Sequence, residues 1–268
     1  MSKIGKFLKG LKLLAGNPWL MNVILDDQEV NKKDIVARYQ LPKGLPTLDL
    51  LELCPNLQET VTPYTYLDGG STLADLLLLK GLARQYAKCA YFEIGTWRGE
   101  SVANVASVAT SCVTLNLPDE TMRTIGLSED YVRLHRYFSK NLPNVIHLQH
   151  DSTTFDFLPY KGKFDLVFVD GDHHYDAVKA DTNNAYSLLR DENSVIVWHD
   201  YGNTPADVRW DVLRGILDGT PIEEHKHLYR VSNTLCAIYC KRPLKGYYPA
   251  EIPEPDKVFE ATIIVKKL

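Results

Sequence analysis

The sequence predicts an α/β fold in which a doubly wound, mostly parallel sheet carries helices on both faces. Three observations predict it. From Cys89 onward, short apolar runs rich in branched and aromatic residues alternate with helical patterns. The first run passes through Gly95 and Gly99 directly into a helical pattern, which is the order strand, glycine turn, helix. The 268 residues are 45% hydrophobic and 24% charged, a composition that provides an ample core.

The chain begins with a basic amphipathic pattern. Lysines recur every three residues from Lys3 to Lys12 among large apolar side chains, and no acid precedes Asp26. Such a helix can lie on an anionic membrane surface as a peripheral contact, pack on its own domain, or pack across a homodimer. Because Gly10 weakens the helix and Pro18 ends it early, we expect it to pack on protein.

The next segment is mixed. Asp26–Tyr39 predicts a polar helix, whereas the four prolines of Leu41–Tyr66 indicate an irregular connector. A glycine pair then precedes Ser71 and Thr72, either of which can cap a buried, leucine-rich helix at Leu73–Tyr86.

The alternating region predicts a parallel sheet that binds ligands at the carboxyl ends of its strands. Its strands are predicted at Cys89–Ile94, Cys112–Leu117, Val145–His150, Phe164–Asp170 and Ser194–Trp198. Its helices are predicted at Glu100–Ala109, after the second strand as far as Leu142, at Tyr175–Arg190 and at Val208–Leu217. Three further strands are predicted, an antiparallel pair and a last one, at Leu228–Val231, Leu235–Cys240 and Ala261–Lys266. We divide the chain into a helical and irregular N-terminal extension (1–70), an α/β domain (71–242) and a tail with an added strand (243–268).

Net charge, cysteine content and the length of apolar runs exclude some classes of protein. The net charge of −4 provides no basic field that would indicate a nucleic-acid partner. The five cysteines are scattered and odd in number, which favours reduced thiols and a cytoplasmic protein. No apolar run approaches the length of a transmembrane helix. These are the features of a soluble globular protein.

The first candidate site is the stretch Glu-Ile-Gly-Thr-Trp-Arg-Gly-Glu-Ser that begins at Glu93. Its glycines let the backbone turn tightly and let a ligand approach, and the following helix directs free N–H groups at that ligand. Glu93, at the tip of the strand, can accept hydrogen bonds from a ligand amine or hydroxyl. A dinucleotide fingerprint would need a glycine at Trp97, so the turn indicates another ligand. The alternative is an ordinary strand-to-helix turn.

The second candidate site follows two apolar strands. Asp170 and His173 come after one of them, and His199 and Asp200 come after the next. Neighbouring strand ends should bring all four together beside the glycine turn. Unpaired burial of such groups is costly, so we expect a metal or a partner there. Two carboxylates and an imidazole suit a divalent cation, with a histidine nearby as general base. Local capping of turns is the alternative.

Together these motifs resemble those of class I S-adenosylmethionine-dependent methyltransferases, which have a Rossmann-like fold. The pattern Glu-Ile-Gly-Thr-x-x-Gly-x-Ser, then Phe-Asp-Leu-Val-Phe-Val-Asp-Gly-Asp-His, then a strand ending in His-Asp is similar to a particular branch of them. That branch comprises metal-dependent O-methyltransferases of small molecules and sugars, including cephalosporin-hydroxylase-like proteins. The resemblance is specific from Tyr91 to Tyr201. It implies two cofactors, S-adenosylmethionine and a divalent metal, magnesium or manganese.

The resemblance also implies roles for individual residues. It makes His173 and Asp170 catalytic, with His173 as the base. It assigns the metal to Asp170, His199 and Asp200, although relatives often have glutamate at the position of His199. It assigns the S-adenosylmethionine site to Glu93, Gly95, Thr96, Gly99, Ser101, Asn116, Asp151 and Ser152. Asn116 stands where the family usually has an acid for the ribose hydroxyls, and Asp151 and Ser152 stand where it contacts the adenine.

The sequence therefore predicts an S-adenosylmethionine-dependent O-methyltransferase acting on a small-molecule or sugar hydroxyl. Asp119 or Glu120 could supply the charge that Asn116 lacks, and His135 is interpreted as a surface or packing residue. Two alternatives stay open. One is a cofactor-binding module without methyl transfer, to which Asn116 points. The other is a metal-dependent oxygenase-like enzyme, because two histidines and a carboxylate suit iron.

Overall fold

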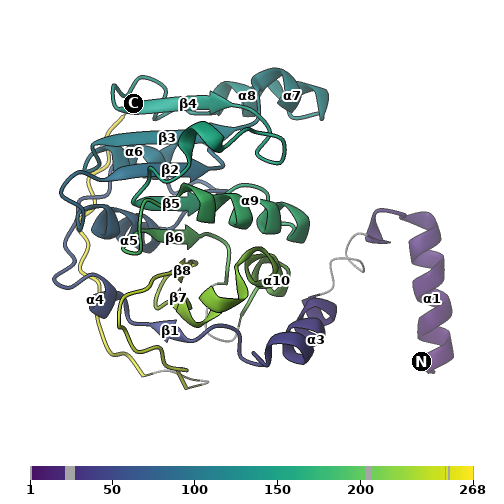
Figure 1. Cartoon of the computed structure of the whole chain (residues 1–268). Coiled ribbons are helices and arrows are strands. Elements are labelled where there is room, and N and C mark those ends of the chain that lie inside the picture. The colour runs from purple at the N-terminus through teal and green to yellow at the C-terminus, as the bar shows by residue number, and fades with distance from the viewer. Residues whose placement is uncertain (1, 22–27, 203–206, 251, 253, 268) are drawn as a thin grey trace.

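The computed structural model describes residues 2–21, 28–202, 207–250, 252 and 254–267. Its centre is an eight-stranded sheet in the order β1-β7-β8-β6-β5-β2-β3-β4 (Figure 1). The strands are β1 Thr47–Leu48, β2 Ala90–Ile94, β3 Ser111–Asn116, β4 Val145–Gln149, β5 Leu166–Val169, β6 Val195–Trp198, β7 Leu228–Val231 and β8 Ala237–Tyr239. Strand β8 is antiparallel to β6 and β7, and the other pairs are parallel. The predicted fold class, a mostly parallel Rossmann-like sheet with an antiparallel strand pair, is confirmed.

Helices cover both faces of the sheet. One layer consists of α3 Gln28–Tyr39, α9 Tyr175–Leu188 and α10 Trp210–Gly219, and the other of α4 Leu50–Leu53, α5 Leu73–Ala83 and α6 Glu100–Ala106. Side chains alternate along each strand, so Phe92 and Ile94 join the first core while Tyr91 joins the second. The remaining helices are α1 Lys3–Gly16, α7 Asp119–Thr124 and α8 Glu129–Leu134, with 3-10 turns at Leu158–Tyr160 and Ile222–His227.

Three sequence-based expectations need correction. The connector is not wholly irregular, because Thr47–Leu48 forms the edge strand β1 and Leu50–Leu53 forms α4. Helix α1 has no buried residue, so the described residues do not pack against it as one domain, and packing across a homodimer stays a prediction. The strand predicted at Ala261–Lys266 does not form: residues 254–267 have no regular secondary structure. An apolar run such as residues 263–265 forms a strand only when it pairs with another strand, and it has no such partner among the described residues.

No described helix is both long and apolar enough to cross a membrane. The five cysteines are unpaired thiols, and all of them are buried.

Candidate active site

The candidate site lies at the carboxyl edge of the sheet, where β2, β5 and β6 end side by side (Figure 1). Val169, the last residue of β5, pairs with Ile94 of β2 and with Trp198 of β6. The residues that follow these strands therefore start level with one another. This arrangement brings Asp170 next to His199, as the order of strands in the sequence predicted.

Asp170, His199 and Asp200 form a compact cluster. Nδ1 of His199 lies 3.1 Å from Oδ1 of Asp170 and 3.5 Å from Oδ1 of Asp200. One possible ligand atom from each residue lies within 4.8 Å of the other two. Nδ1 of His199 is buried, and its neighbours among the described residues are these two carboxylates. A buried imidazole nitrogen facing two carboxylates fits the donor set of a divalent cation.

The backbone at the cluster is unusual. Asp200 has a φ of +58°. A side-chain-bearing residue in this region costs roughly 1–3 kcal/mol, and such residues concentrate at functional sites. The conformation turns the chain sharply after β6, which sets the carboxylate of Asp200 beside the imidazole of His199.

A fourth residue, Asp75, contacts the other ring nitrogen of His199. The sequence alone does not identify it as a site residue. Its Oδ2 lies 3.2 Å from Nε2 of His199, and its side chain is fully buried. Asp75 is held by the capping box of α5 with Thr72, and its Oδ1 accepts a hydrogen bond from the N–H of Leu235 at 2.8 Å. A carboxylate on one ring nitrogen fixes the orientation of a histidine whose other nitrogen meets a metal.

The cluster has a definite charge pattern. Burial alone would lower the pKa of His199, but the carboxylates of Asp170, Asp200 and Asp75 outweigh it and raise that pKa well above its usual value. Burial raises the pKa of Asp170, and the charge on His199 only partly offsets this effect. Burial acts in the same sense on Asp200, yet its hydrogen bond with His199 holds the pKa of Asp200 below its usual value. Three carboxylates thus share one imidazole, an excess of negative charge that a divalent cation would balance.

His173 lies at the open side of the cluster. Its side chain is 50% exposed, and its Nδ1 is 3.9 Å from Oδ2 of Asp200. Its ring stacks on that of His174, which pairs with Asp172. His173 therefore stands near the cluster without belonging to the set of three possible ligands, the position expected of a base.

The glycine turn is organised differently. Glu93 is fully buried, and its carboxylate accepts hydrogen bonds from the hydroxyls of Tyr91 at 2.7 Å and Thr96 at 3.2 Å. Burial raises the pKa of Glu93 to about 7, and a hydrogen bond with Ser101 of α6 acts against this rise. In this conformation Glu93 supports the turn from below, and its oxygens are not open to a ligand.

The two glycines of the turn are required by the packing of the chain itself. Gly95 has a φ of +94°, and a Cβ there would overlap the carbonyl oxygen of Asp170. Gly99 has a φ of +80°, and a Cβ there would overlap the side chain of Ser139. From the sequence alone, we interpret these glycines as positions that a ligand approaches. The structure adds a second reason, which is that Gly95 joins the turn to the cluster through the backbone of Asp170.

His135 closes the space between the turn and the end of β3. The N–H of Thr96 donates to Oδ1 of Asn116 at 3.2 Å, and Nδ2 of Asn116 contacts Nε2 of His135. His135 is 3% exposed, and burial lowers its pKa to about 4. It is a packing residue, as expected, but it packs where the resemblance places the cofactor ribose.

The segment around His135 covers the turn, and we call residues 131–139 the cover. Tyr131 stacks on Trp97 with ring centroids 3.8 Å apart. The N–H of Arg136 donates to the carbonyl of Trp97 at 2.8 Å, and the N–H of Phe138 donates to the carbonyl of Arg98 at 2.9 Å. Two backbone hydrogen bonds and an aromatic stack therefore hold the cover on the predicted cofactor turn.

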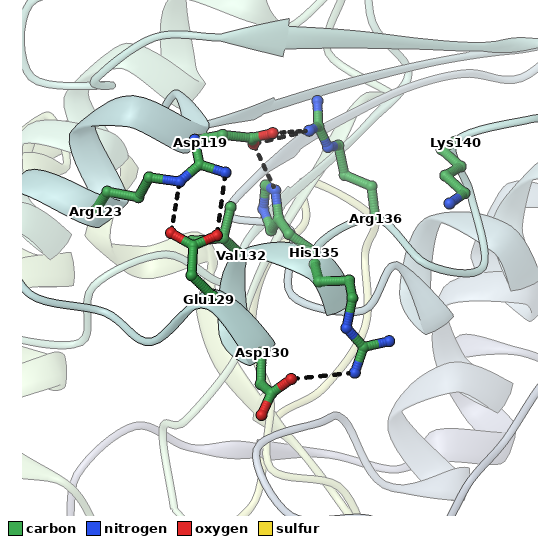
Figure 2. A pocket seen from close by; sticks show the side chains of 9 residues that line it. Asp119, Arg123, Glu129, Asp130, Val132, His135, Arg136 and Lys140 are labelled. Atoms are coloured by element: carbon green, nitrogen blue, oxygen red, sulfur yellow. Dashed lines mark hydrogen bonds and ion pairs between the residues drawn. The ribbon is translucent and has the colours of Figure 1, made fainter.

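A cavity of about 490 Å³ opens between α7, α8 and the cover (Figure 2). Ion pairs cross its wall: Arg136 binds Asp119 at 2.8 Å, and Arg123 binds Glu129 at 2.8 Å (Figure 2). Asp119, which the sequence offered as a substitute acid, is thus already paired. Glu120, the other substitute, pairs with Arg123 at 2.8 Å.

Asp151 and Ser152 follow β4 at the same edge of the sheet. Oδ1 of Asp151 accepts a hydrogen bond from the N–H of Thr153 at 2.9 Å and so closes a local turn. Ser152 hydrogen-bonds Asp181 of α9, a buried carboxylate whose pKa burial raises to about 6. The structure therefore brings the predicted metal residues into contact with one another, whereas the predicted cofactor residues contact their protein neighbours.

Comparison with known families identifies the central part of the chain. Residues 92–201 match a family model described as a methyltransferase domain. The matched segment contains every site residue that the sequence predicted, and it leaves out Asp75. This central segment, less than half of the chain, therefore matches the enzyme class that the sequence predicted.

Solved structures with related folds have low identity. The O-methyltransferase from Bacillus cereus in complex with SAH is 15% identical over 70% of this chain and 88% of that one, with a TM-score of 0.40. CalS10, a SAM-bound amino pentose methyltransferase from Micromonospora echinaspora, is 18% identical over 47% of this chain and 48% of that one, with a TM-score of 0.33. Spermidine synthase from Thermotoga maritima is 13% identical over 64% and 61%, with a TM-score of 0.40.

The chain spans about half the length of several matched structures, between 48% and 52%. TM-scores this low carry no argument about substrate or cofactor. No curated protein matches the chain.

Proposed function

We propose that the protein is an S-adenosylmethionine-dependent O-methyltransferase that acts on a hydroxyl of a small molecule or sugar with the help of a divalent cation. The observation that carries this proposal is the cluster of Asp170, His199 and Asp200 beside the glycine turn, inside a segment that matches a methyltransferase domain. Asp170 connects the cluster to the glycine turn, because its backbone packs against Gly95.

The donor set supports a hard or borderline cation. Asp170, Asp200 and Nδ1 of His199 would hold it, and Asp75 would keep the other ring nitrogen of His199 in place. Carboxylate ligands favour magnesium or manganese, and the imidazole moves the preference toward manganese. A bound divalent cation lowers the pKa of a hydroxyl that it contacts.

The chain's own residues would then control the acceptor proton. S-adenosylmethionine supplies, when bound, a methyl group on a sulfonium that an oxygen nucleophile can take. His173 is half exposed at the mouth of the cluster and can accept the proton of an acceptor hydroxyl at its imidazole. Asp200, whose Oδ2 lies 3.9 Å from Nδ1 of His173, would stabilise the charge that His173 gains. Most of the remaining rate enhancement would come from holding the reacting groups in line.

The site favours this reading over the oxygenase-like alternative. Iron-dependent oxygenases use two histidines and one carboxylate. Among the described residues, the candidate set has one histidine and two carboxylates. The other alternative, a cofactor-binding module without methyl transfer, rests on Asn116, which stands in place of the acid that relatives use for the ribose hydroxyls. Product formation separates it from the enzyme.

Calorimetry with S-adenosylhomocysteine and with Mn²⁺ tests the proposal. The wild-type protein should bind both, and Asp170→Asn should lose Mn²⁺ while it retains S-adenosylhomocysteine. His173→Ala should retain both ligands and lose about 10²–10⁴ in methyl transfer, the usual contribution of a positioned base. Transfer would be assayed with radiolabelled S-adenosylmethionine and a panel of hydroxylated small molecules and sugars. Binding of a nicotinamide dinucleotide instead of S-adenosylhomocysteine would overturn the proposal, and intact transfer in the presence of a chelator would remove the metal from it.

A further inference from the structure

Helix α1 (Lys3–Gly16) has an apolar surface that the described part of the chain leaves exposed. None of its residues is buried, and Figure 1 draws it apart from the sheet and its covering helices. Ile4 is 73% exposed, Phe7 65% and Leu8 59%. Large apolar side chains at such exposure, concentrated on one helix, mark an interaction surface.

Most of the apolar side chains of α1 share one face, whereas Leu13 lies on the opposite one. At about 100° per residue, Ile4, Phe7, Leu8, Leu11 and Leu14 fall within an arc of roughly 120°. Lys6 and Lys9 lie on the opposite face, and Lys3 and Lys12 lie at its two margins. Lysines at the margins can keep their ammonium groups at a polar surface while their stems lie along the apolar one.

The positive charge of α1 indicates what kind of surface the helix binds. The helix carries four lysines and no acid, whereas the whole chain has a net charge of −4. Trp19, which follows the helix, is 63% exposed, and Met21 is 43% exposed. An apolar face, a lysine-rich polar face and a tryptophan beside them are the features of a helix that lies in the plane of a membrane interface. An apolar protein groove would account for the face and leave the lysines without a partner.

We propose that α1 docks the protein on the surface of an anionic lipid bilayer, with its apolar face among the acyl chains and its lysines at the headgroups. The helix has 14 residues, about 21 Å at 1.5 Å per residue, and lies on the bilayer without crossing it. Each lysine near an anionic surface contributes about 1 kcal/mol, which is about fivefold in affinity. This inference is independent of the proposed methyl transfer.

Co-sedimentation of the full chain with vesicles tests the proposal. One vesicle set contains phosphatidylcholine with about one third phosphatidylglycerol, a charge density suited to polybasic segments, and the other contains phosphatidylcholine alone. The protein should sediment with the anionic vesicles, and added salt should weaken that binding. Lys3→Gln with Lys12→Gln, at the margins of the apolar face, should lose about 25-fold in partition coefficient, at about fivefold per lysine. The same charge change at exposed Lys88 and Lys161, away from α1, should have little effect.

A second variant separates lipid burial from charge. Phe7→Gln with Leu8→Gln leaves the charge unchanged and should also release the protein from anionic vesicles. Neither side chain is buried, so far-UV circular dichroism and the unfolding midpoint should match those of the wild type. No binding to anionic vesicles, or equal binding to neutral ones, would overturn the proposal. So would a dimer in solution that Phe7→Gln dissociates, because α1 would then pair with a second copy of the chain.

Discussion

The carboxyl edge of the sheet holds two regions that differ in how open they are to a ligand. At the ends of β5 and β6, the side chains of Asp170, Asp200 and His173 are 25%, 35% and 50% exposed. At the ends of β2 and β3, Glu93 is fully buried and Thr96 is 4% exposed, and the cover lies on the turn between them. The first region presents its charged groups to solvent, and the second has turned its polar groups inward.

A ligand-binding motif in the sequence is therefore not by itself an open binding site in the structure. The glycine turn has the sequence of a ligand-binding turn, yet its polar groups are satisfied by Tyr91, Thr114 and Asn116. In the Asp170 cluster three carboxylates surround one imidazole, which leaves an excess of negative charge. Buried charges of one sign are costly unless an opposite charge balances them, so we expect a cation at the cluster. At the glycine turn, the cover would have to move before a cofactor could bind.

The two regions meet at Gly95, so a side chain at this position should disturb both of them. In Gly95→Ala the new Cβ would overlap the carbonyl of Asp170, and the φ of +94° would be strained as well. The free energy of unfolding should fall by about 2–5 kcal/mol, from strain and overpacking together. Mn²⁺ binding should fall with it, because Asp170 moves. Urea denaturation and calorimetry measure the two effects.

Gly126 offers a matched control. Its φ is +90°, and no atom lies within 4 Å of the position of a Cβ. Gly126→Ala should therefore cost only the backbone strain, about 1–2 kcal/mol. Equal losses in the two variants would mean that the Gly95–Asp170 contact does not couple the regions.

The buried carboxyl of Glu93 should make the stability of the protein depend on pH. The pKa of its buried carboxyl is about 7, against 4.5 in the unfolded chain. Because the folded state binds the proton more tightly, its stability is greatest below pH 4.5 and declines as pH rises through 7. Glu93→Gln should remove up to about 3 kcal/mol of that decline. Unfolding free energies from pH 4.5 to 8 would check it, and parallel profiles of the two proteins would contradict it.

Much of the fold and part of the site could be predicted, for identifiable reasons. Strand β7 was predicted with its observed bounds, because an apolar run beside turn residues is a local signal. Strand β1 was missed, because its two residues carry no periodicity. The cluster at Asp170 was predicted because parallel strands end at a common edge, so sequence order fixes which ends meet.

The remainder of the site depends on contacts that no local pattern reveals. Asp75 lies 124 positions from His199, and its own sequence context predicts only a helix cap. His135 comes from a short connection after α8 whose path over the turn follows from two backbone hydrogen bonds. The pattern Thr72-x-x-Asp75 was the one available signal, and it indicates capping without indicating the histidine behind it.

Asp75 provides a smaller test, confined to the metal region. Asp75→Asn keeps the size of the side chain and removes the charge behind His199. The affinity for Mn²⁺ should fall about 10–100-fold, as for other residues that orient a metal-binding histidine. Binding of S-adenosylhomocysteine should not change. Asp49→Asn is the control, because Asp49 also stabilises a helix start, as the N-cap of α4, without contacting the cluster. If both variants keep the wild-type affinity, Asp75 is only a helix cap.

The smallest expected effect lies at the cover. If His135 occupies the place of the cofactor ribose, the cofactor must displace it, and the fraction of open molecules reduces the apparent affinity. His135→Ala removes one side-chain contact with Asn116, worth about 0.5–1.5 kcal/mol, so S-adenosylhomocysteine should bind about 2–10-fold more tightly. His227→Ala, at the opposite edge of the sheet where β7 begins, should leave the affinity unchanged. Weaker binding by His135→Ala would mean that His135 contacts the cofactor, and the covered turn would then be a formed wall of the site.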